Sequence, residues 1–246
     1  MNDSSLFSLA GTNQLIIGAS KGLGLQIFNS LSGCGSNVLG IGRSKQTLKS
    51  SFSDNYVSCD LNDGTSLLQN IETRFLNSKI DGVTISAGIS LPVDAEMNEG
   101  MRFRKTVEAN LSNIYDCLLN IKPLLNSKSS IILLSSINAN LAFPKNPGYV
   151  ASKSGLSGLT RALALDWGPE GIRVNSLNLG YFHTDMTHES YLDPVKRNDR
   201  SLKTILNRWG EISEVSGPVH FLLSSASSYI TGQALTVDGG WSVKGL

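Results

Sequence analysis

The chain has 246 residues, of which 40% are hydrophobic, 17% are charged and 24 are glycine, and its net charge is +1. This balance gives no electrostatic reason to expect a nucleic acid or a membrane surface as partner. Three cysteines, Cys34, Cys59 and Cys117, lack metal-type spacing and cannot all pair. We therefore expect reduced thiols, no metal site and a cytoplasmic location.

The N-terminal residues carry an acid and no long apolar run, so we expect neither a signal peptide nor a membrane anchor. No repeat, low-complexity tract or linker-like composition interrupts the chain. We therefore expect one domain over residues 1–246.

The first predicted strand covers residues 13–18, and a turn over the next residues leads into a helix that ends near Leu31. Glycines in this turn allow the backbone to approach a diphosphate, and the helix N-terminus offers free N–H groups. The alternative is a tight turn that merely needs small residues. The pattern favours a cofactor-binding loop whose contacts are Gly18, Ser20, Lys21, Gly22, Leu23 and Gly24.

Three further strands are predicted over residues 38–42, 56–59 and 80–86, with a crossover helix over residues 65–76 before the last of them. A long helix is then predicted over residues 100–125, with an apolar stripe along it. Asn110 lies inside that helix, where asparagine is unfavourable. Its side chain is either exposed, bonded locally, or functional.

A central stretch, residues 129–153, carries the chemistry. Its apolar run, residues 131–134, is typical of a strand buried on both faces, and it ends at Ser135 and Ser136. A helix is predicted to begin at about Tyr149, and Lys153 follows one turn later on the same face. Such a trio supports proton transfer at a carbonyl or alcohol, because an ammonium lowers the pKa of a phenol. The alternative is a half-buried tyrosine beside a solvated lysine.

The remaining predicted elements are the rest of the tyrosine helix to residue 165, strands at 172–177 and 234–237, and a helix at 214–223. Residues 181–209 are polar and irregular. Strands alternating with helices predict an α/β fold, a Rossmann-type doubly wound parallel sheet of about seven strands flanked by helices.

The glycine loop, the strand-end serine and the tyrosine–lysine helix, in this order, resemble the short-chain dehydrogenase/reductase family over residues 15–243. The resemblance implies a nicotinamide-dependent oxidoreductase with Ser136, Tyr149 and Lys153 as catalytic residues and Ser135 as a mere neighbour. It matches Asn110 to the asparagine that holds a water in a proton relay to the lysine. It also implies a lid at residues 181–212 and further cofactor contacts at Asp60, Leu61, Ser86, Ala87, Gly88, Tyr149, Lys153, Gly180 and Thr184.

Some positions depart from the family pattern. Ile17 stands where threonine usually precedes the first glycine, and Leu179 stands where proline is usual. Ile85 and Ser86 replace the asparagines of an Asn-Asn-Ala-Gly motif. We therefore expect fewer bracing hydrogen bonds in the cofactor loops and a looser turn at Leu179.

The end of the second strand predicts which nicotinamide cofactor binds. NAD-specific proteins of this fold place a carboxylate there, whereas this chain has Gly42 and no acid until Asp54. Arg43, with Ser44 beside it, and Lys21 in the glycine loop could instead attract the 2′-phosphate of NADP(H). The alternative is that both cations are ordinary surface charges.

We therefore expect an NADPH-dependent oxidoreductase that interconverts a carbonyl and a secondary alcohol of a small molecule. A catalytically silent nucleotide-binding or scaffold protein of the same fold is the rival. A 3-oxoacyl thioester is the alternative substrate class, although Ser127 and Glu170 replace the arginines with which such enzymes dock an acidic carrier.

Two expectations concern surfaces. The lid holds basic residues that form either a solvated helix face or a site for an anionic substrate: Lys196, Arg197, Arg200, Lys203 and Arg208. The resemblance also implies a homotetramer, with a dimer as the alternative.

Overall fold

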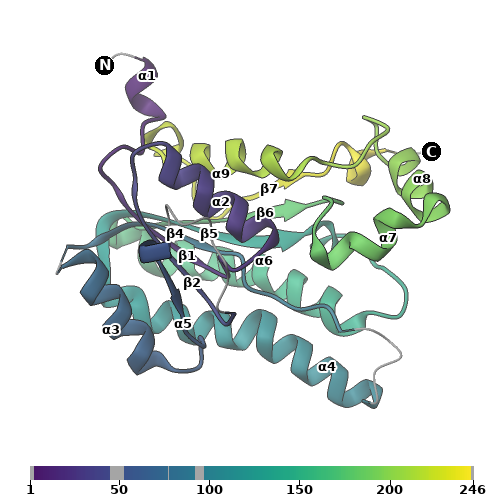
Figure 1. The fold of residues 1–246 in the computed structure, drawn as a ribbon, viewed down its shortest axis with the longest axis horizontal. Helices are drawn as coiled ribbons and strands as arrows, with labels where there is room; N and C mark the ends of the chain where they lie inside the picture. The colour runs from purple at the N-terminus through teal and green to yellow at the C-terminus, as the bar shows by residue number, and fades with distance from the viewer. Residues whose placement is uncertain (1–2, 45–52, 77, 92–96, 245–246) are drawn as a thin grey trace.

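The computed structural model describes residues 3–44, 53–76, 78–91 and 97–244. Within them lies one parallel sheet in the order β3-β2-β1-β4-β5-β6-β7 (Figure 1). This confirms the predicted doubly wound Rossmann-type fold. The strands are β1 Asn13–Ile17, β2 Asn37–Gly42, β3 Tyr56–Ser58, β4 Ile80–Ile85, β5 Leu125–Ser136, β6 Arg173–Leu179 and β7 Ala234–Val237.

Helices cover both faces of the sheet (Figure 1). Their bounds are α1 Asp3–Leu6, α2 Gly22–Gly33, α3 Gly64–Phe75, α4 Glu99–Val107, α5 Asn113–Ile121, α6 Pro147–Trp167, α7 His188–Leu192, α8 Pro194–Lys203 and α9 Ser216–Leu223. α2 and α9 pack on one face, whereas α3, α5 and α6 pack on the other.

Alternate residues of each strand supply the two hydrophobic cores. In β1, Leu15 and Ile17 belong to the core under α3, α5 and α6, and Ile16 belongs to the core under α2 and α9. All three side chains are fully buried. A parallel strand covered on both faces must be apolar at successive positions, which explains why the apolar runs predicted these strands.

The order of strands reverses at β1, which pairs with β2 on one side and with β4 on the other. In open α/β sheets, this switch point leaves a crevice beyond the carboxyl ends of the strands. The β1–α2 turn and the residues after β4 meet there.

The long helix predicted over residues 100–125 is interrupted in the structure. α4 gives way to a π-helical turn, Glu108–Ser112, before α5, and a 3-10 turn, Lys122–Leu124, follows. Pro123 lies in that last turn, and β5 already begins at Leu125, so the predicted helix end was too late. The tyrosine helix α6 begins two residues earlier than predicted, at Pro147, because proline suits the first turn of a helix.

Candidate active site

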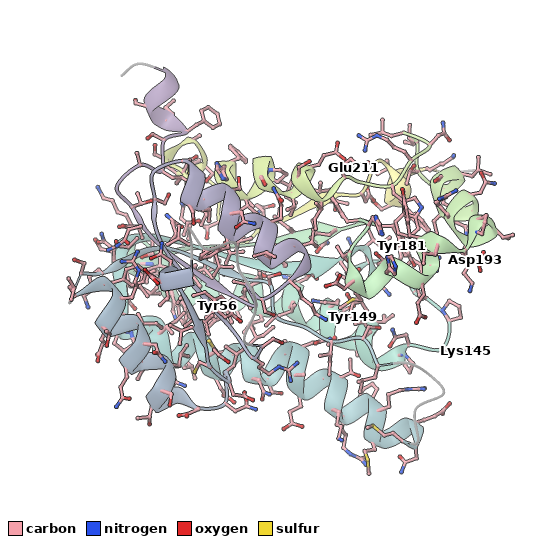
Figure 2. The ribbon with its side chains drawn as sticks, in the orientation of Figure 1. Tyr56, Lys145, Tyr149, Tyr181, Asp193 and Glu211 are labelled. Carbon is pink, nitrogen blue, oxygen red and sulfur yellow. The ribbon has the colours of Figure 1, made fainter. Side chains whose placement is uncertain are left out.

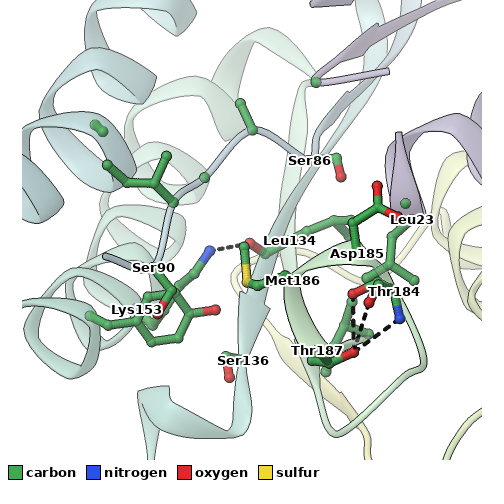
Figure 3. A pocket seen from close by; sticks show the side chains of 18 of the residues that line it. Leu23, Ser86, Ser90, Leu134, Ser136, Lys153, Thr184, Asp185, Met186 and Thr187 are labelled. Atoms are coloured by element: carbon green, nitrogen blue, oxygen red, sulfur yellow. Dashed lines mark hydrogen bonds between the residues drawn. The ribbon is translucent and has the colours of Figure 1, made fainter. Parts of the chain in front are cut away.

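A cavity of about 700 Å³ opens at the carboxyl ends of the strands (Figure 3). Nearly all the residues predicted for the site line it. They are Gly18, Ser20, Lys21, Gly22, Leu23, Arg43, Ser44, Asp60, Leu61, Ser86, Ala87, Gly88, Ser136, Tyr149, Lys153, Gly180 and Thr184. Gly24 and Asn110 do not line it.

The glycine loop forms one wall of this cavity. Gly18 and Gly22 have φ angles of 89° and 56°, which side chains rarely adopt. A Cβ at Gly18 would lie 2.5 Å from the backbone nitrogen of Ala87, so only glycine lets the loops after β1 and β4 touch. A Cβ at Gly24 would lie 2.1 Å from the Gly18 carbonyl oxygen. Gly24 therefore allows α2 to pack on the loop, and its cofactor contact stays a prediction.

Backbone hydrogen bonds hold the loop where the family's threonine is missing. The amides of Gly18 and Ala19 donate to the carbonyl of Ile41, at 2.7 and 3.0 Å. The Ser86 amide donates to the Ile17 carbonyl at 2.8 Å. Ile17 itself is a buried core residue of β1. The substitution thus leaves the loop braced through the main chain.

The first residues of α2, Gly22 and Leu23, line the cavity. Lys21 is the N-cap residue, and its side chain does not cap the helix. Unpaired N–H groups and the helix dipole favour an anion at this position. These features fit a dinucleotide diphosphate.

Leu179 does not produce the looser turn predicted from the missing proline. It is the last residue of β6, is buried, and pairs with Val237 of β7. The next amide, that of Gly180, donates to the Val237 carbonyl at 3.0 Å. The sheet ladder therefore fixes this backbone without a proline ring.

The structure brings Ser136, Tyr149 and Lys153 together. Ser136 ends β5, and Tyr149 and Lys153 lie in the first turns of α6. The Lys153 Nζ donates to the Leu134 carbonyl at 2.9 Å and lies 5.6 Å from the centre of the Tyr149 ring (Figure 3). The Ser136 hydroxyl accepts from the Asn138 amide at 3.2 Å. It also hydrogen-bonds the Tyr149 side chain.

Burial controls the protonation of this group. It is the largest of the effects that together raise the pKa of Tyr149 to about 12; the hydrogen bond with Ser136 lowers this pKa and Tyr181 raises it. Burial also lowers the pKa of Lys153 to about 8. The sequence predicts that Lys153 lowers the Tyr149 pKa, and the structure shows the opposite net shift. The phenol therefore keeps its proton at neutral pH and is suited to act as an acid.

Asn110 is fully buried in the π-helical turn and clamps the segment after β4. Its Oδ1 accepts from the Ile89 amide at 2.7 Å, and its Nδ2 donates to the Ile89 carbonyl at 2.9 Å. The same Nδ2 donates to Ser152 on α6 at 3.2 Å. The side chain is thus neither exposed nor locally bonded, because its partners lie 21 and 42 positions away in the sequence. The proton relay stays a prediction.

Several further residues line the cavity, and of these sequence reasoning had singled out Arg200 alone. Tyr181, Met186 and Arg200 line it, as do Phe143 after β5 and Asn113 on α5. The aromatic rings of Phe143 and Tyr181 are 6.4 Å apart although they lie far apart in sequence. Arg200 belongs to the basic cluster for which the sequence left open a site for an anionic substrate.

The β2 end of the cavity is shaped by a residue that was also missed, Tyr56. A Cβ at Gly42 would lie 2.8 Å from the Tyr56 hydroxyl oxygen and 3.0 Å from the Ser20 Cβ. The Tyr56 hydroxyl is held in place, donating to the Ser44 carbonyl at 2.6 Å. A side chain at position 42 would require the Tyr56 hydroxyl and Ser20 to shift, so the packing disfavours a carboxylate there. Arg43 and Lys21 are exposed at the cavity, and neither is ion-paired within the described residues.

No cluster of possible metal ligands occurs among the described residues. In the same part of the chain, none of the helices has the length and apolar character to cross a membrane.

Comparison with known proteins agrees with this geometry. The family model described as enoyl-(acyl carrier protein) reductase matches residues 18–242. A gluconate 5-dehydrogenase from Gluconobacter oxydans is 31% identical over 99% of both chains. The sorbose reductase of Schizosaccharomyces pombe is 32% identical over 96% of this chain and 98% of its own.

Among solved structures, a gluconate 5-dehydrogenase from Burkholderia cenocepacia in complex with NADP and tartrate superimposes with a TM-score of 0.88. It is 27% identical and covers 98% of this chain and 99% of its own. The fold of the present chain, its glycine loop, and its serine, tyrosine and lysine at one sheet edge agree with these comparisons. The chain belongs to the short-chain dehydrogenase/reductase family, nicotinamide-dependent oxidoreductases that act on CH–OH groups.

Proposed function

We propose that the protein is an NADPH-dependent reductase of a small carbonyl compound, with Tyr149 as the acid. The observation that carries the proposal is that Ser136, Tyr149 and Lys153 share one cavity with the glycine loop. The nicotinamide, when bound, supplies the hydride to the carbonyl carbon. The chain's own residues must then hold the carbonyl oxygen and give it a proton.

Each residue has a distinct part in this proposal. The Tyr149 hydroxyl gives its proton to the carbonyl oxygen as negative charge develops there, so that the carbonyl becomes a secondary alcohol. Ser136 donates a hydrogen bond to the same oxygen. Lys153, beside the Tyr149 ring, stabilises the phenolate left behind, and Asn110 keeps the backbone after Gly88 in position. In the direction of oxidation, the same steps run backwards.

A preference for NADP(H) over NAD(H) is supported by the β2 end of the cavity. The chain has Gly42 where NAD-specific proteins place a carboxylate that holds the ribose hydroxyls, and Tyr56 and Ser20 pack closely against that position. Arg43 and Lys21 lie where the 2′-phosphate would need cations. The Burkholderia cenocepacia neighbour is a complex with NADP.

A carrier-bound 3-oxoacyl substrate is disfavoured by the surface beside β5. Glu170 stands where the family's carrier-docking arginine is expected, and it pairs with Lys122 at 2.7 Å. This pair neutralises a cation where an acidic carrier would need one. The relatives named for gluconate and sorbose support a polyhydroxylated small molecule instead.

Tyr149→Phe tests the catalytic proposal. We expect the NADPH-dependent rate of carbonyl reduction to fall by at least about a hundredfold, because general acid catalysis contributes on that order. Tyr115→Phe, an exposed tyrosine on α5, is the control and should keep the wild-type rate. An unchanged rate in Tyr149→Phe would refute the mechanism. A wild-type protein that binds NADPH but reduces no carbonyl would support the catalytically silent alternative.

A further inference from the structure

The five cations of the lid are not equivalent in the structure. Lys196 pairs with Asp193 at 3.1 Å, and Lys203 pairs with Asp199 at 3.0 Å. Arg208 pairs with Glu214 at 2.7 Å through both of its terminal nitrogens. These three charges are neutralised by carboxylates on their own surface, which supports a solvated helix face for them.

The two remaining arginines differ in what they face. Arg197 is exposed, with its guanidinium carbon 5.4 Å from the centre of the Tyr191 ring. Arg200, one helical turn later on α8, instead lines the cavity. Its Nη1 is buried and has no hydrogen-bond partner among the described residues. A buried, unsatisfied guanidinium nitrogen is unfavourable unless a ligand supplies the acceptor.

Arg200 lies against aromatic rings of the lid region. Its guanidinium carbon lies 4.7 Å from the centre of the Tyr181 ring and 5.9 Å from that of Trp209. The Tyr181 ring in turn lies 5.1 Å from the Trp241 ring. Tyr181 is close enough to Tyr149 to influence its ionisation, and Figure 2 shows both tyrosines on the same side of the molecule. Cation–π contacts with these rings hold the guanidinium, and its Nη1 has no hydrogen-bond partner among the described residues.

We propose that Arg200 binds the carboxylate of the substrate, so that the preferred substrates are small hydroxy and keto acids of the sugar-acid class. The inference rests on the proposed reductase function. A guanidinium edge matches a carboxylate with two parallel charge-assisted hydrogen bonds. One acid, Asp185, also lines the cavity. It follows Thr184, and a Cβ built at Gly22 of the glycine loop would lie 3.8 Å from the Thr184 Cβ. Asp185 forms no ion pair with Arg200 among the described residues.

Two carbonyl substrates with and without a carboxylate separate this role from catalysis in general. We would measure NADPH-dependent reduction of 5-ketogluconate and of uncharged sorbose by wild type, Arg200→Gln and Arg197→Gln. The last variant removes the same charge from the same helix but outside the cavity. In Arg200→Gln, kcat/KM for the keto acid should fall roughly 10- to 100-fold, mainly through KM, with less than about threefold change for sorbose. Arg197→Gln should change neither, and Arg200→Lys should restore part of the loss.

Equal losses for both substrates in Arg200→Gln, or equal losses in the two arginine variants, would overturn the assignment. So would a wild-type enzyme that prefers sorbose. If wild type reduces neither compound, the proposed reductase function is wrong. The role of Arg200 is then tested by the binding of gluconate. Gluconate should then raise the melting temperature of the NADPH-loaded wild type and of Arg197→Gln but not that of Arg200→Gln. No shift in wild type, or the same shift in all three proteins, would refute it.

Discussion

At the scale of single residues, Lys153 combines a catalytic position with an unfavourable environment. Its ammonium is almost fully buried, donates to the Leu134 carbonyl, and has its pKa lowered to about 8 by desolvation. The ordinary value is 10.5, so between about pH 8 and 10.5 the unfolded chain holds more protons than the folded one. Stability therefore rises with pH across that window, and the full penalty of burial is present below it.

Lys153→Met should separate stability from activity. At pH 7 the variant should be more stable than wild type by about 1–3 kcal/mol, because the desolvation penalty exceeds the single bond to Leu134. The gain should shrink as pH approaches 10, and reductase activity should be lost. Chemical denaturation at pH 7 and pH 9.5 measures this. Lys128→Met, at an exposed lysine, should change stability by less than about 0.5 kcal/mol. A pH-independent difference for Lys153→Met would contradict the explanation.

Arg43 is the residue on which the cofactor preference depends most directly. Arg43→Ala removes a cation that faces the expected 2′-phosphate, and NADH has no such phosphate. We expect the KM for NADPH to rise more than about tenfold, equivalent to about 1.5–3 kcal/mol, with little change for NADH. Arg161→Ala, at an exposed site on α6, is the control. A wild-type preference for NADH, or equal effects on both cofactors, would show the assignment to be wrong.

At the scale of elements, the π-helical turn between α4 and α5 places a polar side chain, Asn110, against the cavity wall. The wider turn carries Asn110, whose amide reaches both backbone groups of Ile89, next to Gly88 in the cavity wall. π-helical turns are frequently found at functional sites. Here the turn joins α5, the segment after β4 and, through Ser152, α6.

Asn110→Ala should therefore loosen the cavity wall as well as the helix. Removing the amide leaves the Ile89 N–H and C=O without their partner, which should reduce the free energy of unfolding by about 1–3 kcal/mol. Because Ala87 and Gly88 line the cavity, the KM for NADPH should rise too. Asn120→Ala, an exposed asparagine on α5, should alter neither quantity. Wild-type affinity for NADPH in Asn110→Ala would show that the clamp has no part in cofactor binding. Urea denaturation and cofactor titration supply the two measurements.

At the scale of the whole molecule, the two cores share one sheet, which supports our proposal of a single domain. Several large apolar side chains nevertheless remain exposed on the helices of one face and on β7. They are Phe103 on α4, Tyr115 and Leu119 on α5, Leu165 on α6, and Leu235 on β7, an edge strand of the sheet. Such surfaces support our proposal of a symmetric homo-oligomer.

Light scattering at micromolar concentration tests that proposal. We expect a mass of four chains of 26.4 kDa, or of two. Leu165→Glu should weaken assembly, because this leucine is 77% exposed on α6. Leu76→Glu, at the 81% exposed C-cap of α3, should leave the mass unchanged. A wild-type mass of one chain would contradict the proposal.

The sequence by itself determined the parts of this protein that depend on neighbours along the chain. Strands covered on both faces require unbroken apolar runs such as residues 131–134. The α2 turn requires glycine at positive φ, and Tyr149 and Lys153 share a face because they are four residues apart. Only the tertiary structure decided that Arg200 lines the cavity while Lys196 and Lys203 are ion-paired, and that Tyr56 lies against position 42. It also decided the high pKa of Tyr149. These properties arise from desolvation and from contacts between residues distant in sequence, and no local pattern encodes them.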